Sequence, residues 1–173
     1  MHCCHSVSLS ECQVIISLPQ YTFFGGWYEW EYCPSNHYVN AFKLKVEHEQ
    51  GEFVDDTALN GIKFYCGKIG EEFNPNISIT SKVGHWGQWG NIFKCLDLSI
   101  ATGLQLRSER YQGIFDDTAA NNLKMFCLDG IRHEGDGTRW GRWSPLMTCP
   151  PKTAICGFRT QVETPTNNGT STF

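Results

Sequence analysis

The sequence predicts an all-β protein, and three observations support this expectation. Several segments alternate apolar and polar residues with a period of two, as in 42–46 and 62–66, which is typical of half-buried strands. Glycine, asparagine and aspartate lie between such segments, for example at Asn60-Gly61, and these residues favour turns. No stretch shows a capped helical period. We therefore expect about four short strands in each structural unit of the chain.

Length and composition indicate one folded domain. The chain has 173 residues, of which 40% are hydrophobic and 18% are charged, so we expect a folded chain rather than an intrinsically disordered one. The formal net charge of −4 argues against nucleic acid or an anionic membrane as the main partner, because both require clustered Lys and Arg. No apolar run approaches the roughly 18 residues that a membrane-spanning helix needs.

The chain contains an internal repeat. The block Asp55–Cys66 reappears as Asp116–Cys127, and a strand-like block at 41–47 reappears at 103–109 and 157–163. A W-x₂-W pair occurs three times and is each time followed by a cysteine; the pairs are Trp27/Trp30 before Cys33, Trp86/Trp89 before Cys95, and Trp140/Trp143 before Cys149. We expect three repeats, at about 13–70, 71–130 and 131–173, within a single domain at 13–173.

The third repeat is expected to be truncated. It ends without a copy of the Asp-Asp-Thr block and its closing cysteine, so the last strand of this repeat should be missing. A missing strand would leave an open sheet edge with unpaired backbone groups and lower the stability of the chain, with Val14-Ile15-Ile16 lying near the gap. Residues 1–12 should form a disordered N-terminal extension.

Nine cysteines indicate an oxidising, extracellular environment. Residues 1–18 lack the features of a signal peptide, which a truncated start would explain. Zinc binding is not expected, because the body of the chain lacks C-x₂-C and H-x₃-H spacings. Repeat symmetry predicts the disulfides Cys33–Cys66 and Cys95–Cys127, and leaves Cys149 to pair with Cys156. The three remaining cysteines should be free or disordered: Cys3, Cys4 and Cys12. Two glycosylation acceptors are Asn76 and Asn168.

These repeats resemble the vitelline membrane outer layer protein 1 family. The resemblance rests on W-x₂-W, a cysteine, an F-x-L-x-V-E strand and D-D-T-A-L-N before a second cysteine, and it extends from about Gln13 to Glu163. It implies a β-prism of three Greek-key sheets with pseudo-threefold symmetry around one apolar core. It also implies secretion into egg coats or other extracellular fluids, a weak transferase-like activity on N-acetylated chito-oligosaccharides, and binding to glycoprotein fibres.

The tryptophans allow two interpretations. Trp27, Trp86 and Trp140 are candidates for carbohydrate binding, because flat aromatic faces stack on sugar rings. All six tryptophans could instead be core anchors, and their threefold repetition favours this structural role, since a symmetric core needs every copy whereas a binding site usually needs one.

Carboxylates are the candidates for chemistry. Glu47, Glu109 and Glu163 occur once per repeat, and symmetry could gather them at one end of the molecule, where a pair would suit glycoside chemistry. The alternative is an exposed or backbone-bonded glutamate. The pairs Asp55/Asp56 and Asp116/Asp117 are expected to form Asx turns. We expect no metal and no cofactor, because the corresponding motifs are absent.

We therefore expect a secreted, monomeric structural or interaction protein of an extracellular coat or fluid. Its partners should be extracellular glycoproteins or glycans, with no nucleic acid and no membrane. The alternatives are a weak transferase acting on N-acetylated chito-oligosaccharides and a lectin-like module without catalysis.

Overall fold

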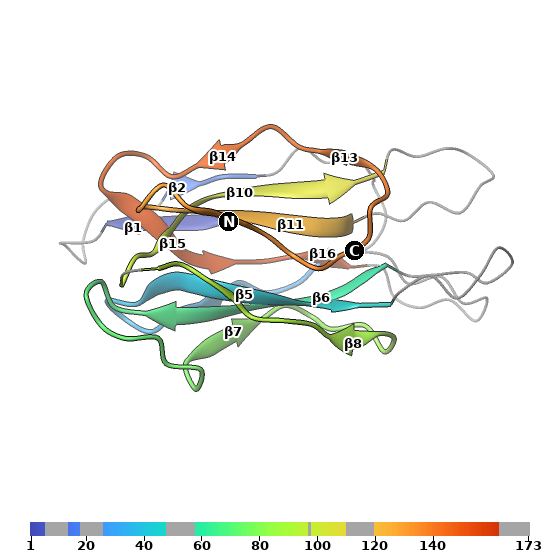
Figure 1. The fold of residues 1–173 in the computed structure, drawn as a ribbon, viewed down its shortest axis with the longest axis horizontal. Coiled ribbons are helices and arrows are strands. Elements are labelled where there is room, and N and C mark those ends of the chain that lie inside the picture. Colours follow the sequence, from blue (N-terminus) through green and yellow to red (C-terminus); the bar gives the residue numbers. More distant parts are fainter. Residues whose placement is uncertain (6–13, 18–25, 48–57, 97, 110–119, 163–173) are drawn as a thin grey trace, which may run out of the picture.

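The structure is a computed structural model, and it describes residues 1–5, 14–17, 26–47, 58–96, 98–109 and 120–162. These residues form sixteen strands and no helix (Figure 1). The predicted all-β class is confirmed. Among the described residues there is accordingly no helix with the length and hydrophobicity to cross a membrane.

The first sheet is built around the antiparallel pair of β5 (Tyr38–Val46) and β6 (Leu59–Gly67). Along this pair the apolar residues Phe42 and Leu44 are buried, whereas the intervening Lys43 is only partly buried, as the period-two pattern predicts. Three short strands complete the sheet: β7 (Ser78–Thr80) on β6, and β8 (Gln88–Trp89) and β9 (Phe93–Lys94) on β5.

The second sheet has the same order of strands. Its central pair is β10 (Ala101–Ser108) and β11 (Ala120–Cys127). The short strands are β12 (Arg132–Glu134) on β11, and β13 (Arg142–Trp143) and β14 (Met147–Thr148) on β10. The tryptophan-bearing strands β8 and β13 therefore each join the sheet of the central pair that precedes them in the chain.

The third sheet joins the two ends of the described chain. β15 (Thr153–Phe158) pairs with β1 (His2–His5), and β2 (Val14–Ile15) pairs with the outer side of β1. On the other side of β15 lies β4 (Glu31–Tyr32), and a separate two-stranded ladder joins β16 (Gln161–Val162) to β3 (Gly26–Trp27). β1 thus occupies in the third sheet the place that β6 and β11 occupy in the other two.

Two expectations about the ends of the chain are therefore wrong. The edge of β15 is not open, because β1 pairs with it in a register that places Cys3 opposite Ile155. Residues 2–5 are not a disordered extension, because they form this strand. Met1 also packs against the core, at the position that by strand register corresponds to Phe64 of β6 and Met125 of β11. Val14 and Ile15 were expected to lie near this edge, and they form β2, which pairs with the outer side of β1.

A β-bulge occurs at the same position in each sheet. The register shifts between Val39 and Ala41 in β5, between Ala101 and Gly103 in β10, and at the corresponding point of the β1–β15 pair. The carbonyls of the extra residues accept hydrogen bonds from three cysteine amides, namely Cys95 to Asn40 at 2.8 Å, Cys149 to Thr102 at 2.7 Å, and Cys33 to Cys156 at 2.8 Å. The bulge therefore positions one cysteine beside each sheet.

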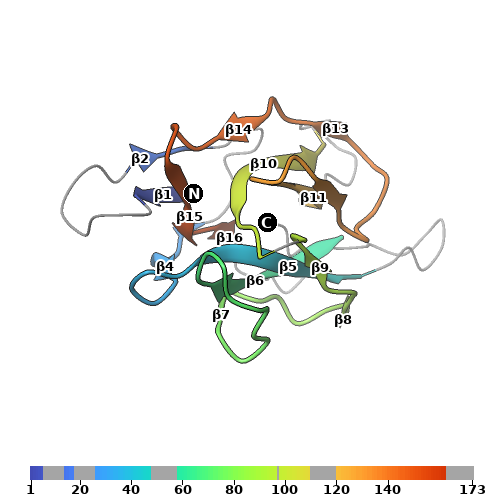
Figure 2. The same ribbon diagram turned by 60° about the vertical axis from the view of Figure 1, so that its left-hand side comes forward.

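The core lies between the three sheets. One cluster of buried side chains contains Phe42 and Phe64 from the first sheet, Leu123 and Met125 from the second, and Phe158 from the third. Phe64 and Phe158 contact edge to face, with ring centroids 4.7 Å apart. Figure 2 shows the strands of the three sheets arranged around this common interior.

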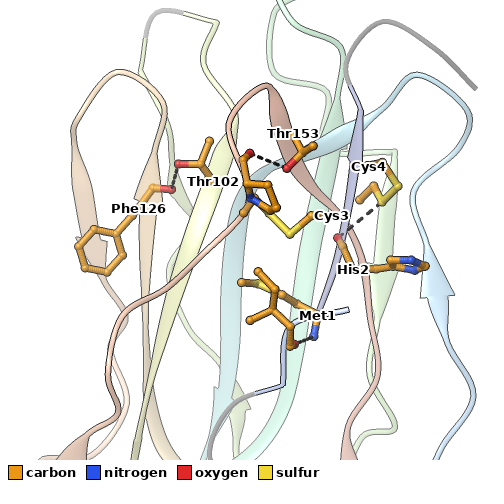
Figure 3. Close-up of a disulfide and its surroundings, with 11 residues drawn as sticks. Met1, His2, Cys3, Cys4, Thr102, Phe126 and Thr153 are labelled. Carbon is orange, nitrogen blue, oxygen red and sulfur yellow. Dashed lines mark hydrogen bonds between the residues drawn. A yellow bond between two sulfur atoms is a disulfide. The ribbon is translucent and has the colours of Figure 1, made fainter. Parts of the chain in front are cut away.

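The structure describes four disulfides, and two of them are the expected pairs Cys33–Cys66 and Cys95–Cys127. The expected pair Cys149–Cys156 is wrong, because Cys149 is bonded to Cys3 and Cys156 to Cys4. The physical reason is the pairing of β1 with β15. This pairing places Cys4 beside Cys156 on β15, and Cys3 beside Cys149, which follows β14. Their disulfides lie on opposite sides of β1 (Figure 3). Cys12 lies outside the described residues.

Three of these disulfides join the sheets in a ring. Cys33, whose amide bonds to β15 of the third sheet, is linked to Cys66 in the first sheet. Cys95, which follows β9 of the first sheet, is linked to Cys127 in the second. Cys149, which follows β14 of the second sheet, is linked to Cys3 in the third. Each sheet is thus covalently bonded to both of the others.

Candidate functional site

The tryptophans lie on the outside of the sheets. Trp27, Trp86 and Trp140 are 53%, 53% and 54% exposed, and the other three tryptophans are partly buried. None of the six belongs to the buried core. The interpretation of the tryptophans as core anchors is therefore wrong, because the inward-facing positions are filled by smaller residues such as Leu44 and Ile62.

The strand register also corrects the alignment of the tryptophans. Trp27 pairs with Gln161, Trp89 with Lys45 and Trp143 with Arg107, and these partners occupy equivalent positions in the three sheets. Trp27 is thus the counterpart of Trp89 and Trp143, not of Trp86 and Trp140. In the sequence, Trp86 and Trp140 then correspond to Phe24, and the first W-x₂-W pair matches the others only by coincidence.

A cation lies against each of these register-equivalent tryptophans. The Lys43 and Lys63 ammonium groups lie 5.2 and 5.3 Å from the Trp89 ring centroid. The Trp143 ring has Lys124 at 4.2 Å and Arg107 at 5.6 Å, and the Trp27 ring has Arg159 at 4.7 Å. Such contacts are typically worth about 0.5–1 kcal/mol at exposed sites. Their occurrence in every sheet indicates a structural role.

The cations of the second sheet are also held by protein groups. Lys124 forms a salt bridge with Glu134, with 3.1 Å between nitrogen and oxygen. Arg107 donates a hydrogen bond to the carbonyl of Gly141 at 3.3 Å. These side chains therefore already have partners within the protein.

The third sheet carries additional aromatic side chains. Arg159 lies over a second ring, Trp30, at 4.9 Å from its centroid, and Trp30 stacks on Tyr32 with centroids 6.0 Å apart. The His2 ring lies 5.2 Å from both of these rings, and its Nδ1 is 3.0 Å from the Tyr32 hydroxyl. We refer to His2, Trp27, Trp30, Tyr32 and Arg159 as the third-sheet aromatic cluster.

The local sequence explains why this cluster forms. Trp30 and Tyr32 are two residues apart around β4, so they project on the same side of an extended chain. β1 brings His2 beside them, because His2 and Tyr32 both pair with Gly157. A Cβ on Gly157 would meet the Tyr32 ring, so the absence of a side chain there lets the ring lie against β15.

Two members of the cluster, Trp30 and Tyr32, have no aromatic counterpart in the other sheets. By strand register, Trp30 corresponds to Ile92 and Leu146, and Tyr32 corresponds to Lys94 and Thr148. Sequence reasoning missed Trp30, Tyr32, His2 and Arg159 as a group. The signal that could have found part of it is the aromatic density of the run from Trp27 to Tyr32, which the other two repeats lack.

Burial governs the electrostatics beside the cluster. The pKa of His2 is lowered from 6.5, first by burial and then by the Met1 ammonium. Burial also lowers the pKa of that ammonium to about 6, with the charge of Arg159 as the smaller cause. At neutral pH, Arg159 is thus the cation that the cluster presents to solvent. The Nε2 atom of His2 is buried and has no hydrogen-bond partner among the described residues.

The candidate glutamates follow the central strands. Glu47 is 8% exposed, and its amide donates a hydrogen bond to the Ala58 carbonyl at 2.9 Å. Glu109 follows β10 and is partly buried, whereas Glu163 lies outside the described residues. The gathering of all three glutamates therefore stays a prediction. The expected Asx turns at Asp55/Asp56 and Asp116/Asp117 also lie outside the described residues.

Two further expectations concern metal and glycan attachment. Among the described residues, no three His, Cys, Asp or Glu side chains lie close enough to hold a metal ion. Asn76 is exposed in a turn, where its backbone N–H donates a hydrogen bond to the Asn74 side-chain oxygen at 3.0 Å. The Asn76 side chain is thus accessible for attachment of a glycan. Asn168 lies outside the described residues.

The fold and surface define an all-β protein whose sheets are cross-linked by disulfides and whose outer faces carry tryptophan. The family model of vitelline membrane outer layer protein I matches residues 14–172. The chain is 34% identical over 152 residues to the vitelline membrane outer layer protein 1 homolog of Mus musculus, covering 86% of this chain and 75% of that protein. It is 36% identical over 151 residues to the homolog of Homo sapiens, covering 86% and 74%.

The chain belongs to the vitelline membrane outer layer protein I family. The resemblance drawn from the repeats is thereby confirmed. The match begins at residue 14, so it does not include β1, although β1 completes the third sheet. Four disulfides and membership of this family are consistent with an extracellular protein.

Proposed function

We propose that this protein is a secreted structural or interaction component of an extracellular coat or fluid, and that it binds extracellular glycoproteins or glycans. The observation that carries the proposal is the ring of disulfides that joins the three sheets. Structural disulfides of this kind are typical of oxidising compartments, and the ring makes the protein a rigid support for its outer surfaces. We also infer that the three sheets are the faces of the β-prism implied by the family resemblance.

A rigid support of this kind suits binding better than catalysis that depends on moving parts. The exposed tryptophans offer apolar faces to solvent on more than one sheet, and large exposed aromatic side chains mark interaction surfaces. The net charge of −4 disfavours nucleic acid and anionic membranes. Glycans are therefore the partner class that best fits these surfaces, and we expect the protein to act as a monomer.

The test compares binding to glycosylated and deglycosylated partners. The oxidised full chain is passed over immobilised mucin, over the same mucin after enzymatic removal of its glycans, and over albumin. We expect retention on intact mucin and little retention on the other two surfaces. Equal retention on all three surfaces, or none on any, would contradict the proposal.

Transfer between N-acetylated chito-oligosaccharides is the alternative that the family resemblance implies. A glycoside mechanism needs two carboxyl groups about 5–10 Å apart. The described geometry does not single out such a pair, so this alternative rests on the resemblance alone. Mass spectrometry of chito-oligosaccharides incubated with the protein, and with the variants Glu47→Gln and Glu109→Gln, decides it. Lengthened products that both variants fail to make would establish the activity.

A further inference from the structure

The repeat provides an internal control for the third-sheet aromatic cluster. Three sheets with the same strand order fold around one core, yet only the third carries aromatic side chains at the positions of Trp30 and Tyr32. The equivalent positions in the other sheets hold Ile92 or Leu146 and Lys94 or Thr148. The fold therefore does not require aromatic residues at these positions, and a role outside stability has to explain them.

The cluster is open to solvent. The Trp27 side chain is 53% exposed and that of Tyr32 is 46% exposed, whereas His2 is buried beneath the neighbouring rings. Exposed aromatic residues that adjoin one another are uncommon on monomeric proteins and mark binding surfaces. Trp27 lies on β3, which pairs with β16, and Tyr32 lies on β4, which pairs with β15. Arg159 contacts the rings of Trp27 and Trp30, and Trp30 stacks on Tyr32, so one ligand can contact both ends of the cluster.

Arg159 adds a charge to this surface. Among the described residues, Arg159 forms no ion pair and no hydrogen bond, and its guanidinium lies between 4.7 and 4.9 Å from the centroids of Trp27 and Trp30. Exposed Glu31 is paired in register with Phe158, whose side chain faces the core, so Glu31 lies on the opposite side of the sheet from Arg159. Arg159 thus presents a fork of free N–H donors beside two aromatic rings.

This combination matches one chemical class of ligand. The C–H faces of pyranose rings stack on aromatic side chains, and a guanidinium binds a carboxylate or a sulfate through two parallel hydrogen bonds. We propose that the third-sheet aromatic cluster binds a glycan that carries a carboxylate or sulfate group, with Arg159 pairing with the acidic group and Trp27 and Tyr32 stacking on the sugar rings. The inference deepens the proposed function, because it assumes that glycans are the partners.

The single unpaired cation of the cluster also limits how many acidic groups of a ligand this surface can bind. Polyanions such as nucleic acids require several Lys and Arg side chains along one surface, whereas this surface offers one guanidinium between aromatic rings. The ligand is therefore expected to place one acidic group at Arg159. A glycan whose acidic groups are isolated on a mostly uncharged chain fits better than a densely charged one.

The experiment uses three probes that share one core. Lactose, 3′-sialyllactose and 3′-sulfolactose are titrated into the oxidised full chain by isothermal calorimetry. We expect the two acidic probes to bind at least tenfold more tightly than lactose. The sialyl and sulfo probes distinguish a carboxylate from a sulfate preference. Equal affinities for the three probes, or no binding of either acidic probe, would overturn the inference.

Substitutions copied from the other sheets locate the site. Arg159→Gln introduces the residue that the second sheet has at this position, Gln105, and should reduce the affinity for the acidic probes to that for lactose. Trp30→Leu and Tyr32→Thr copy Leu146 and Thr148 and should weaken binding of all three probes. The matched control is Lys43→Gln, which removes the equivalent cation of the first sheet and should leave affinity unchanged.

The outcomes separate this inference from the proposed function. If Lys43→Gln and Arg159→Gln weaken binding equally, the third sheet is not the site. If the acidic probes fail to bind while intact mucin is still retained, the inference fails and the proposed function stands. If mucin is not retained but the acidic probes bind as predicted, the proposed glycoprotein partner is wrong. Thermal melts of each variant verify folding, and Arg159→Lys, which keeps the charge without the planar fork, should show intermediate affinity.

Discussion

Cys3 is bonded to Cys149 although 146 residues separate them in the chain. The bond repeats in the third sheet the geometry of Cys33–Cys66 and Cys95–Cys127, in which a cysteine directly after a short outer strand, β4 or β9, is bonded to one on a central strand. The neighbouring Cys4–Cys156 bond connects β1 directly to β15 and has no counterpart in the other two sheets. Both disulfides therefore attach the same short strand, β1, to the rest of the protein.

The two disulfides of β1 should therefore act non-additively. With one in place, removing the other opens only a short loop, worth about 2.5 kcal/mol in the chain-entropy model. Removing both also opens the long loop, for a total of about 7 kcal/mol, which exceeds the sum of the single effects by about 2 kcal/mol. Urea unfolding of Cys3→Ser/Cys149→Ser, Cys4→Ser/Cys156→Ser and the fourfold variant measures this. Strict additivity would show that β1 is not held jointly.

Deleting residues 1–5 should expose the edge of β15. The loss of the β1 ladder and of the Met1 contact with the core should lower the melting midpoint markedly. A C-terminal extension that copies residues 55–67 should raise the midpoint of the deleted chain but not that of the intact chain, because β1 already pairs with the edge. An equal rise in both chains would contradict the assignment of β1 to this edge.

Gly87 should tolerate a side chain less well than Gly70. Both have positive φ, at 78° and 82°, so alanine is strained at either position by about 1 kcal/mol. A Cβ at Gly87 would also meet the carbonyl of Val46 and the amide of Glu47, whereas a Cβ at Gly70 would meet nothing within 4 Å. We expect Gly87→Ala to cost about 2–4 kcal/mol. The difference between the unfolding free energies of Gly87→Ala and Gly70→Ala, measured by chemical denaturation, isolates the cost of the close approach of Gly87 to Val46 and Glu47.

The stability should fall in acid partly through His2. Its pKa is lowered in the folded state, chiefly by burial, so the unfolded chain binds more protons than the folded one as the pH falls below about 6.5. The free energy of unfolding should then decrease with falling pH in this window. His2→Phe, which copies Phe126 of the second sheet, removes the titration. Melting midpoints at pH 8, 6.5 and 5 should show a smaller loss for the variant, and parallel losses would exclude His2 as the source.

Most of the strand pattern could be predicted from the sequence. The alternation around Phe42 and Phe64 reflects burial of one side of each central strand. The similar spacing of two cysteine pairs, 33 and 32 residues, reflects equivalent positions in two sheets. The role of β1 could not be predicted in this way, because the repeat comparison follows chain order. A four-residue strand far from its partner has no periodicity to reveal it.

The surface location and the strand register of the tryptophans could not be predicted from the repeat pattern either. Trp27 and Trp30 have the spacing of the other two pairs, but only the strand register shows that Trp27 corresponds to Trp89. Threefold repetition suggested a core role, yet repeated surface contacts between tryptophan and Lys or Arg produce the same repetition. The candidate site on the third sheet depends on contacts between segments distant in the chain, His2, Tyr32 and Arg159, which no local motif encodes.

The closure of the sheets by Cys3–Cys149 also has a consequence for attack by proteases. Every peptide bond between these two cysteines lies inside a loop that the disulfide closes. A single cleavage anywhere in that span therefore leaves the two fragments covalently attached. In a fluid rich in proteases, such a nicked molecule would keep its surfaces together until a second cut or reduction of the disulfide separates the pieces.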